Sequence, residues 1–256
     1  MTMGIDPLRL SRAERLLWSY GVLEPAHIDL EGIALDQGAR VRYRTLDGCE
    51  ARLVARGQAA VISINATSTE GRQRFSLAHE LAHWICDRTT GSFICAKEDI
   101  GPQNAEARSV EALANDYASQ LLLPDYLVVP WIEGKRASLD VASSLAKQFN
   151  ASLTAAAIAL ARKAQRAACV ACHSQTKLEW FRKNRTFPGE MFLRRELHQD
   201  TAAFELAFGS TSGMSTPKRE SADRWVSGPN AYRTTVESQS IRLPDRTVLT
   251  LLSLLS

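Results

Sequence analysis

The sequence has no apolar run long enough to cross a bilayer, and its start has no basic segment followed by an apolar core. A membrane span needs about 18 apolar residues or more, and an export signal needs that basic-then-apolar order. The apolar stretch at 248–256 is shorter and predicts a buried strand or a docking segment. These absences predict a cytoplasmic protein that contacts no membrane.

The sequence also has little excess of positive over negative charge. Its 31 Lys and Arg nearly balance its 28 Asp and Glu, which gives a net charge of +3. So small an excess does not require an anionic partner, so we expect no direct contact with nucleic acid. The 5 cysteines are an odd number at uneven spacing. This favours reduced thiols over a disulfide framework.

Two of the cysteines lie in the pattern Cys169-Val-Ala-Cys172-His173. The pattern is typical of c-type haem attachment, which requires an export route that this sequence does not indicate. Ordinary thiols are therefore the favoured interpretation. A structural metal or a redox pair is the alternative.

The apolar pattern predicts an α+β protein. Helices are expected at 8–20 and from Asp29 to Gly38, followed by a small meander or hairpin-plus-strand sheet within 39–65. Further helices are expected at 74–86, 104–123, 139–150 and 152–167, with a loop after the first of them. The composition changes beyond Ala168, and 209–225 is expected to be a flexible loop. We predict a catalytic domain at 1–168 and a C-terminal region at 169–256, which could serve as a sensor or as a substrate-docking module.

The helix expected at 74–86 carries the sequence His79-Glu80-Leu-Ala-His83. Histidines four apart project from one helix face, close enough to bind one metal ion. Glu80 lies about 100° round the helix, where its carboxylate could accept a proton from a water on the metal. This arrangement predicts zinc-dependent hydrolysis of a peptide bond.

A catalytic zinc site of this kind needs a third protein ligand, and Glu106 and Glu111 are the candidates on the next helix. Glu111 shares a face with Asn115 among apolar neighbours, where a metal would offset the desolvation of the carboxylate. Asn115 could orient a ligand imidazole through a hydrogen bond. A solvated Glu111 and a capping Asn115 are the alternatives.

Two blocks of this sequence, in this order, resemble the ImmA/IrrE family of metallo-endopeptidases. The first matches its Arg-x-Phe-[Ser/Thr]-x-Ala-His-Glu-x-[Gly/Ala]-His motif at Arg74, Phe75, Ser76, Ala78, His79, Glu80, Ala82 and His83. The second matches its Glu-x-x-Ala-Asn-x-[Phe/Tyr]-Ala-x-x-Leu-Leu-x-Pro motif at Glu111, Ala114, Asn115, Tyr117, Ala118, Leu121, Leu122 and Pro124. The resemblance covers roughly residues 10–165.

The resemblance implies a zincin-like fold with a small mixed sheet, and the active helix packed behind it among several helices. It implies His79, His83 and Glu111 as metal ligands and Glu80 as the base. Its members typically cut a helix-turn-helix repressor of the XRE type, which releases genes for stress responses or mobile elements. Zinc is the expected metal, and manganese is possible at a site of two histidines and one glutamate.

Other interpretations stay open. The helices at 139–150 and 152–167 could form a DNA-binding helix-turn-helix, but the second is poor in base-reading side chains, so packing against the catalytic domain is favoured. A non-enzymatic transcription regulator with a structural metal is the alternative function, and a general protease or toxin is a weaker one. Tyr126, His173 and His198 are possible oxyanion donors, none of them preferred.

Overall fold

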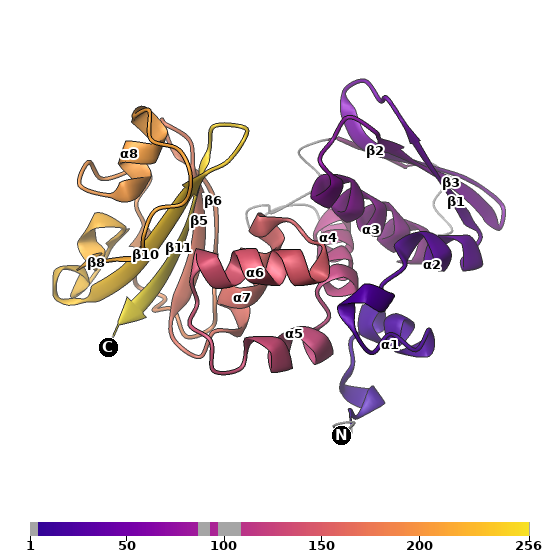
Figure 1. Ribbon diagram of the computed structural model, residues 1–256, viewed down its shortest axis with the longest axis horizontal. Coiled ribbons are helices and arrows are strands. Elements are labelled where there is room, and N and C mark those ends of the chain that lie inside the picture. The colour runs from indigo at the N-terminus through magenta and orange to yellow at the C-terminus, as the bar shows by residue number, and fades with distance from the viewer. Residues whose placement is uncertain (1–4, 87–92, 97–108, 256) are drawn as a thin grey trace. The chain divides into compact units, whose positions relative to one another are not determined.

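The fold is described from a computed structural model that covers residues 5–86, 93–96 and 109–255 (Figure 1). The chain forms two compact units, the first of residues 1–131 and 147–152, and the second of residues 132–146 and 153–256. The described residues form both α-helices and β-sheets, which confirms the predicted α+β class. The composition change at residue 168 lies inside the second unit, and the predicted division of function there stays a prediction.

Among the described residues, the first unit holds the α-helices α1 to α4, most of α5, the strands β1 to β4, and two short 3-10 helices at Pro7–Arg9 and Pro25–His27. Their bounds are α1 Arg12–Ser19, α2 Leu30–Asp36, β1 Ala39–Arg44, β2 Cys49–Arg56, β3 Ala59–Asn65, α3 Glu70–Cys86, β4 Phe93–Ala96, α4 Ser109–Leu122 and α5 Asp125–Ile132. These elements include the helices and the three strands expected from the sequence. The strand β4 lies where a loop was expected, because four residues are too few to give a recognisable alternation.

The four strands form one sheet in the order β1-β3-β2-β4. The strands β2 and β3 pair as an antiparallel hairpin, and β1 adds to β3 in the parallel direction. The sheet is therefore mixed, as the resemblance implied. Of the two arrangements expected from the sequence, the hairpin plus a strand is the one observed.

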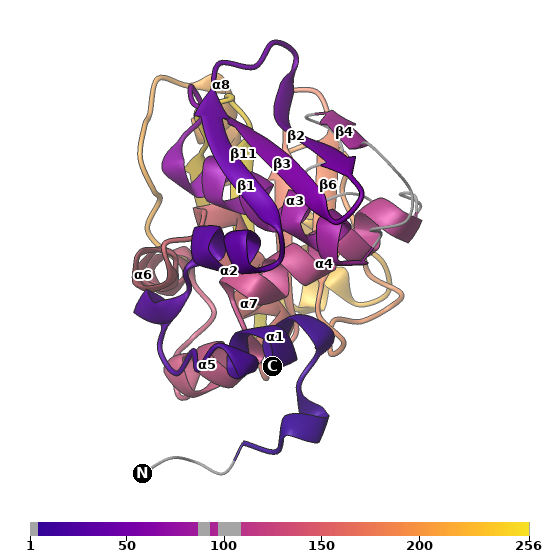
Figure 2. The ribbon, with the colours of Figure 1, turned by 90° about the vertical axis from the view of Figure 1, so that its right-hand side faces the viewer.

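One face of this sheet is apolar and is covered by helices. Ala51, Leu53, Ile62 and Ile64 are at most 1% exposed and alternate with outward-facing residues along β2 and β3. The helices α2 and α3 contact these strands, and α4 packs against α3 (Figure 2). The helix α3 is therefore enclosed by the sheet and α4, and its side chains from Phe75 to Trp84 are buried.

A buried carboxylate joins the starts of two helices in this unit. Glu14, only 5% exposed, accepts a hydrogen bond from the backbone N–H of Ser11 at the start of α1, where Ser11 and Glu14 form a capping box. Its other oxygen accepts from the backbone N–H of Tyr126 at the start of α5. One side chain thus satisfies backbone donors of both helices, which helix ends leave without internal partners.

The second unit is built on a five-stranded antiparallel sheet of order β6-β5-β11-β10-β8, with a separate β7-β9 pair. Most of α6 and all of α7 precede it. The bounds are α6 Leu139–Phe149, α7 Leu153–Lys163, β5 Ala168–His173, β6 Leu178–Lys183, β7 Phe192–Leu193, α8 Ala202–Phe208, β8 Lys218–Ser221, β9 Val226–Ser227, β10 Thr235–Arg242 and β11 Val248–Leu255.

The helices of this unit pack against its sheet. The helix α7 contacts β5 and β6, and α8 contacts β10 and β11. The second helix of the possible helix-turn-helix therefore buries its apolar side against this sheet. The predicted buried strand at the end of the sequence is confirmed as β11, which pairs on both sides.

The segment expected to be a flexible loop, 209–225, is partly ordered by backbone pairing. Residues Lys218–Ser221 form the edge strand β8 against β10, so that expectation is wrong for this part. A low content of apolar residues hides an edge strand, because such a strand obtains its order from hydrogen bonds to its neighbour. Within the described residues, no helix has both the length and the hydropathy needed to cross a membrane.

The role of Glu14 can be tested by Glu14→Ala. The substitution removes the acceptor of two helix-start donors, and we expect the free energy of unfolding to fall by about 2 kcal/mol. Urea denaturation followed by tryptophan fluorescence measures this. The matched control is Glu133→Ala at an exposed position, with an expected change below about 0.5 kcal/mol. Equal stability of the two variants would contradict the bridging role.

Candidate metal centre

The helix α3 is held at both ends by side chains that bond to the backbone of neighbouring segments. Near its start, the amide nitrogen of Gln73 donates to the carbonyl oxygens of Asn65, Ala66 and Ser68, at 2.9 to 3.2 Å. Near its end, the indole N–H of Trp84 donates to the carbonyl oxygen of Gln37 at 2.7 Å. These bonds fix the position and rotation of the helix relative to the sheet.

The loop before α3 is itself organised by the buried side chain of Asn65. Its amide nitrogen donates to the carbonyls of Leu46 and Cys49, and its oxygen accepts from the backbone and hydroxyl of Thr67. A buried Asn that satisfies both ends of its amide is a strong local constraint. The sequence analysis missed both Asn65 and Gln73.

Three side chains from two helices converge beside the middle of α3. The Nε2 atoms of His79 and His83 lie 3.2 Å apart. The Oε2 atom of Glu111, on α4, lies 3.3 Å from the Nε2 of His79 and 3.4 Å from the Nε2 of His83. Both histidines are fully buried, while the Glu111 side chain is 20% exposed.

The surroundings favour the protonation states that a divalent metal requires. Burial lowers the pKa of His79, and the neighbouring His83 lowers it further. Hydrogen bonds with Glu111 and Asn115 raise this pKa but do not reverse the shift. The pKa of Glu111 is lowered, chiefly by its hydrogen bond with His79 and against the effect of burial. Neutral imidazole and ionised carboxylate are the forms that coordinate a metal.

The spacing of the three donor atoms fits a tetrahedral metal ion. Ligand bonds of about 2.0–2.1 Å at tetrahedral angles separate neighbouring ligand atoms by about 3.3–3.4 Å. The observed separations are 3.2, 3.3 and 3.4 Å. Among the described residues, His79, His83 and Glu111 form the one group of this kind. The residues present therefore fit the metal that the motif predicted.

The two remaining predicted residues lie beside this group. Glu80 is 0% exposed and follows His79 directly on α3. Asn115 lies one turn beyond Glu111 on α4, within hydrogen-bonding reach of His79, and favours the charged form of that histidine. The roles of Glu80 as base and of Asn115 as an orienting residue stay predictions.

Of the other candidates named from the sequence, one is not described and one is engaged elsewhere. Glu106 lies outside the described residues. The hydroxyl of Tyr126 donates to the carbonyl oxygen of Val22, and its ring packs edge-on against Trp18. Burial raises the pKa of Tyr126 to about 12. The phenol is thus engaged in packing α5 against the start of the chain.

The remaining cysteine motif does not form a metal site among the described residues. Cys169 and Cys172 are three apart on β5, so their side chains leave opposite faces of the sheet. Burial raises their pKa values, to about 12 for Cys169 and about 11 for Cys172. Both are therefore inert buried thiols, which was the favoured interpretation.

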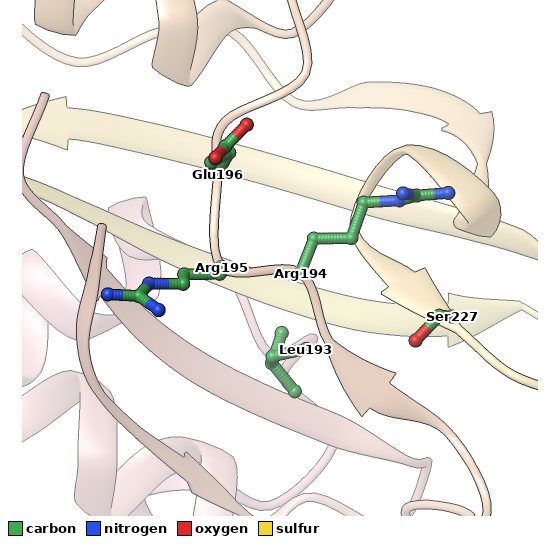
Figure 3. A pocket seen from close by; sticks show the side chains of 5 residues that line it. All are labelled: Leu193, Arg194, Arg195, Glu196 and Ser227. Carbon is green, nitrogen blue, oxygen red and sulfur yellow. The ribbon is translucent and has the colours of Figure 1, made fainter. Parts of the chain in front are cut away.

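A shallow hollow in the second unit offers no convergent chemistry. It has a volume of about 320 Å³ and is lined by Leu193, Arg194, Arg195, Glu196 and Ser227. The charged ends of Arg194 and Arg195 point apart, so they do not address one ligand (Figure 3).

The sequence model of the IrrE N-terminal-like domain, peptidase M78, matches residues 34–161 of this chain. No curated protein matches the chain. Among solved structures, a Mycobacterium tuberculosis transcriptional regulator is similar, with a TM-score of 0.61 and 13% sequence identity. The similarity covers 94% of this chain and 74% of that one, and at this identity it shows a shared fold alone.

The metal centre predicts a graded response to substitution. We expect the wild-type chain to bind about one zinc ion, and His79→Ala to abolish binding, because two protein ligands do not hold the ion. Asn115→Ala should weaken zinc binding by about 10–100-fold, the usual cost of losing a partner that orients a ligand. Competition with a chromophoric chelator measures both. Gln120→Ala, on the same helix, is the control, and an Asn115→Ala affinity equal to it would exclude the orienting role.

Proposed function

Since this chain belongs to the peptidase M78 family, which is defined by the IrrE N-terminal-like domain, we propose that it is a metal-dependent endopeptidase. The observation that carries the proposal is the triangle of His79, His83 and Glu111, with sides of 3.2 to 3.4 Å. Such a set leaves a fourth position of a tetrahedral ion for water or substrate. A purely structural zinc site would have all four positions filled by protein.

In this proposal some residues bind the metal ion and another residue transfers the proton of the attacking water. His79, His83 and Glu111 hold the metal, which when bound supplies a Lewis acid that makes water acidic and polarises a carbonyl. Glu80 is the general base, because its carboxylate is carried on the same rigid helix as both histidines.

We propose zinc as the metal, with manganese as the alternative. The two imidazoles suit zinc, while an oxygen ligand and an open position are also acceptable to manganese. Cellular supply decides between them at sites of this composition. Metal replacement in the purified chain distinguishes the two by the activity that each restores.

The proposed substrate is a helix-turn-helix repressor, whose cleavage would release stress-response or mobile-element genes. Support comes from the family motifs at residues 74–83 and 111–124, whose members typically cut such proteins. The similar solved structure is titled a transcriptional regulator, which is compatible with a role in gene control. We propose a cytoplasmic location for the same reason, since repressors act there.

The test is to incubate the chain and zinc with a helix-turn-helix repressor encoded beside it. We expect one or a few discrete fragments from the wild type, and a loss of rate of at least about 100-fold for Glu80→Gln, since general-base catalysis contributes about 10²–10⁴-fold. Gel electrophoresis and mass spectrometry follow the fragments. Zinc affinity should be retained in Glu80→Gln, which separates loss of chemistry from loss of metal.

Three outcomes would argue against this function. Equal cleavage by wild type and Glu80→Gln would point to a contaminating protease. Repressor control that persists in Glu80→Gln without cleavage would favour a non-enzymatic regulator. Broad digestion of casein without preference for the repressor would favour a general protease.

A further inference from the structure

The outward face of the first sheet carries a regular array of arginines. We call it the arginine face, and it consists of Arg40, Arg42 and Arg44 on β1 with Arg52 and Arg56 on β2. Arg40, Arg42, Arg44 and Arg56 are exposed, and Arg52 is half-buried. Neither the metal centre nor the proposed peptidase activity uses them.

Strand alternation places these side chains on the side of the sheet away from α2 and α3. On β1 they alternate with Ala39, which is fully buried, and with Tyr43, whose hydroxyl donates to Glu31 of α2. The guanidinium of Arg44 bonds the hydroxyl of Ser63 on the neighbouring β3, which confirms that these two share a face. The helices α2 and α3, which contact this sheet, lie against the opposite face.

The positive charge of this face is not balanced from within the described part of the chain. No carboxylate there forms an ion pair with any of the five arginines, whereas Arg72 lies 3.9 Å from Glu50 and Arg224 pairs with Glu220. The Nε atom of Arg52 is in addition buried without a hydrogen-bond acceptor among those residues.

The arginines are evenly spaced along β1, whereas on β2 Val54 separates Arg52 from Arg56. Side chains two apart on a strand are about 6.6 Å apart, so Arg40 to Arg44 span about 13 Å. The strand β3 lies between β1 and β2, which separates the two arginine rows by about 9.6 Å. The regular row of positive charge along β1, with further arginines about two strands away, fits a partner whose negative charge also repeats along its length.

The composition of the face separates a nucleic acid from an acidic protein. On β1, β2 and β3 its apolar members are Val54, Ala59 and Val61, and no aromatic side chain lies among these outward positions. Protein interfaces concentrate aromatic and apolar side chains at their centre, whereas surfaces that bind nucleic acid are polar and rich in arginine. Guanidinium groups also bind phosphate in a bidentate manner.

We propose that the arginine face binds the phosphate backbone of a nucleic acid without reading its sequence. Contacts to phosphate fix position and carry no base information. The proposal departs from the expectation of no nucleic-acid contact, which rested on the net charge of +3 for the whole chain. The proposal does not depend on the peptidase activity. The metal centre lies on the helices that cover the apolar face of the sheet, whereas the arginines lie on the opposite face.

The test measures binding of the full chain to a short labelled DNA duplex of mixed sequence by fluorescence anisotropy at several salt concentrations. The triple variant Arg40→Gln/Arg42→Gln/Arg44→Gln should bind about tenfold or more weakly. Its slope of log affinity against log salt should be smaller by about 2.7, since each lost phosphate contact removes about 0.9. All three side chains are exposed, so we expect the variant to fold, with unchanged zinc binding as the check.

The matched control removes the same charge at exposed arginines elsewhere, with Arg9→Gln/Arg219→Gln/Arg233→Gln. We expect it to keep most of the affinity and the slope of the wild type. Equal weakening by both triple variants, or no measurable binding of the duplex by wild type, would overturn the proposal. Tighter binding of polyglutamate than of the duplex would also overturn it, in favour of an acidic protein partner.

Discussion

The short distance between the imidazoles of His79 and His83, inside a helix that is buried on all sides, is the constraint on which the first unit depends. Two nitrogen lone pairs at 3.2 Å in a dry interior repel each other, and a shared proton or cation offsets this. Holding them there requires a helix that neither turns nor slides. The bonds of Gln73 at one end and Trp84 at the other supply that restraint. The third donor then comes from α4, across a contact that buries both helices.

The cluster of His79, His83 and Glu111 could be predicted from the sequence because each part of it follows a helical period. His79 and His83 are one turn apart, and Glu111 begins a helix with its own apolar stripe. The restraints of Gln73 and Asn65 were not predictable in the same way. Their partners are backbone carbonyls, whose directions depend on the path of a loop that no periodicity describes. The strand β4 escaped prediction for the related reason that its order comes from pairing with β2.

The first sheet shows how one alternating pattern serves two surfaces. Inward positions on β2 and β3 are small or branched and support α3, while the outward positions on β1, and Arg52 and Arg56 on β2, are arginines. The alternating arginines Arg40, Arg42 and Arg44 are visible in the sequence. The net charge of the whole chain does not reveal them, because acidic residues elsewhere cancel their charge. Strand alternation also separates Cys169 and Cys172. They are three residues apart on β5, so their side chains lie on opposite faces of the sheet. In a strand, only residues separated by an even number of positions share a face, and a proposed binding motif has to satisfy this rule.

The position of β11 has a consequence for how the second unit is made. Within its sheet this strand is the last to be synthesised, yet it lies at the centre, between β5 and β10. During translation the strands on either side therefore emerge without the neighbour that joins them, and each exposes an unpaired edge until residues 248–255 leave the ribosome. The first sheet, by contrast, has its central β3 in place by residue 65. A premature stop that removed only β11 would thus split the second sheet in two, while the metal ligands would already have been made.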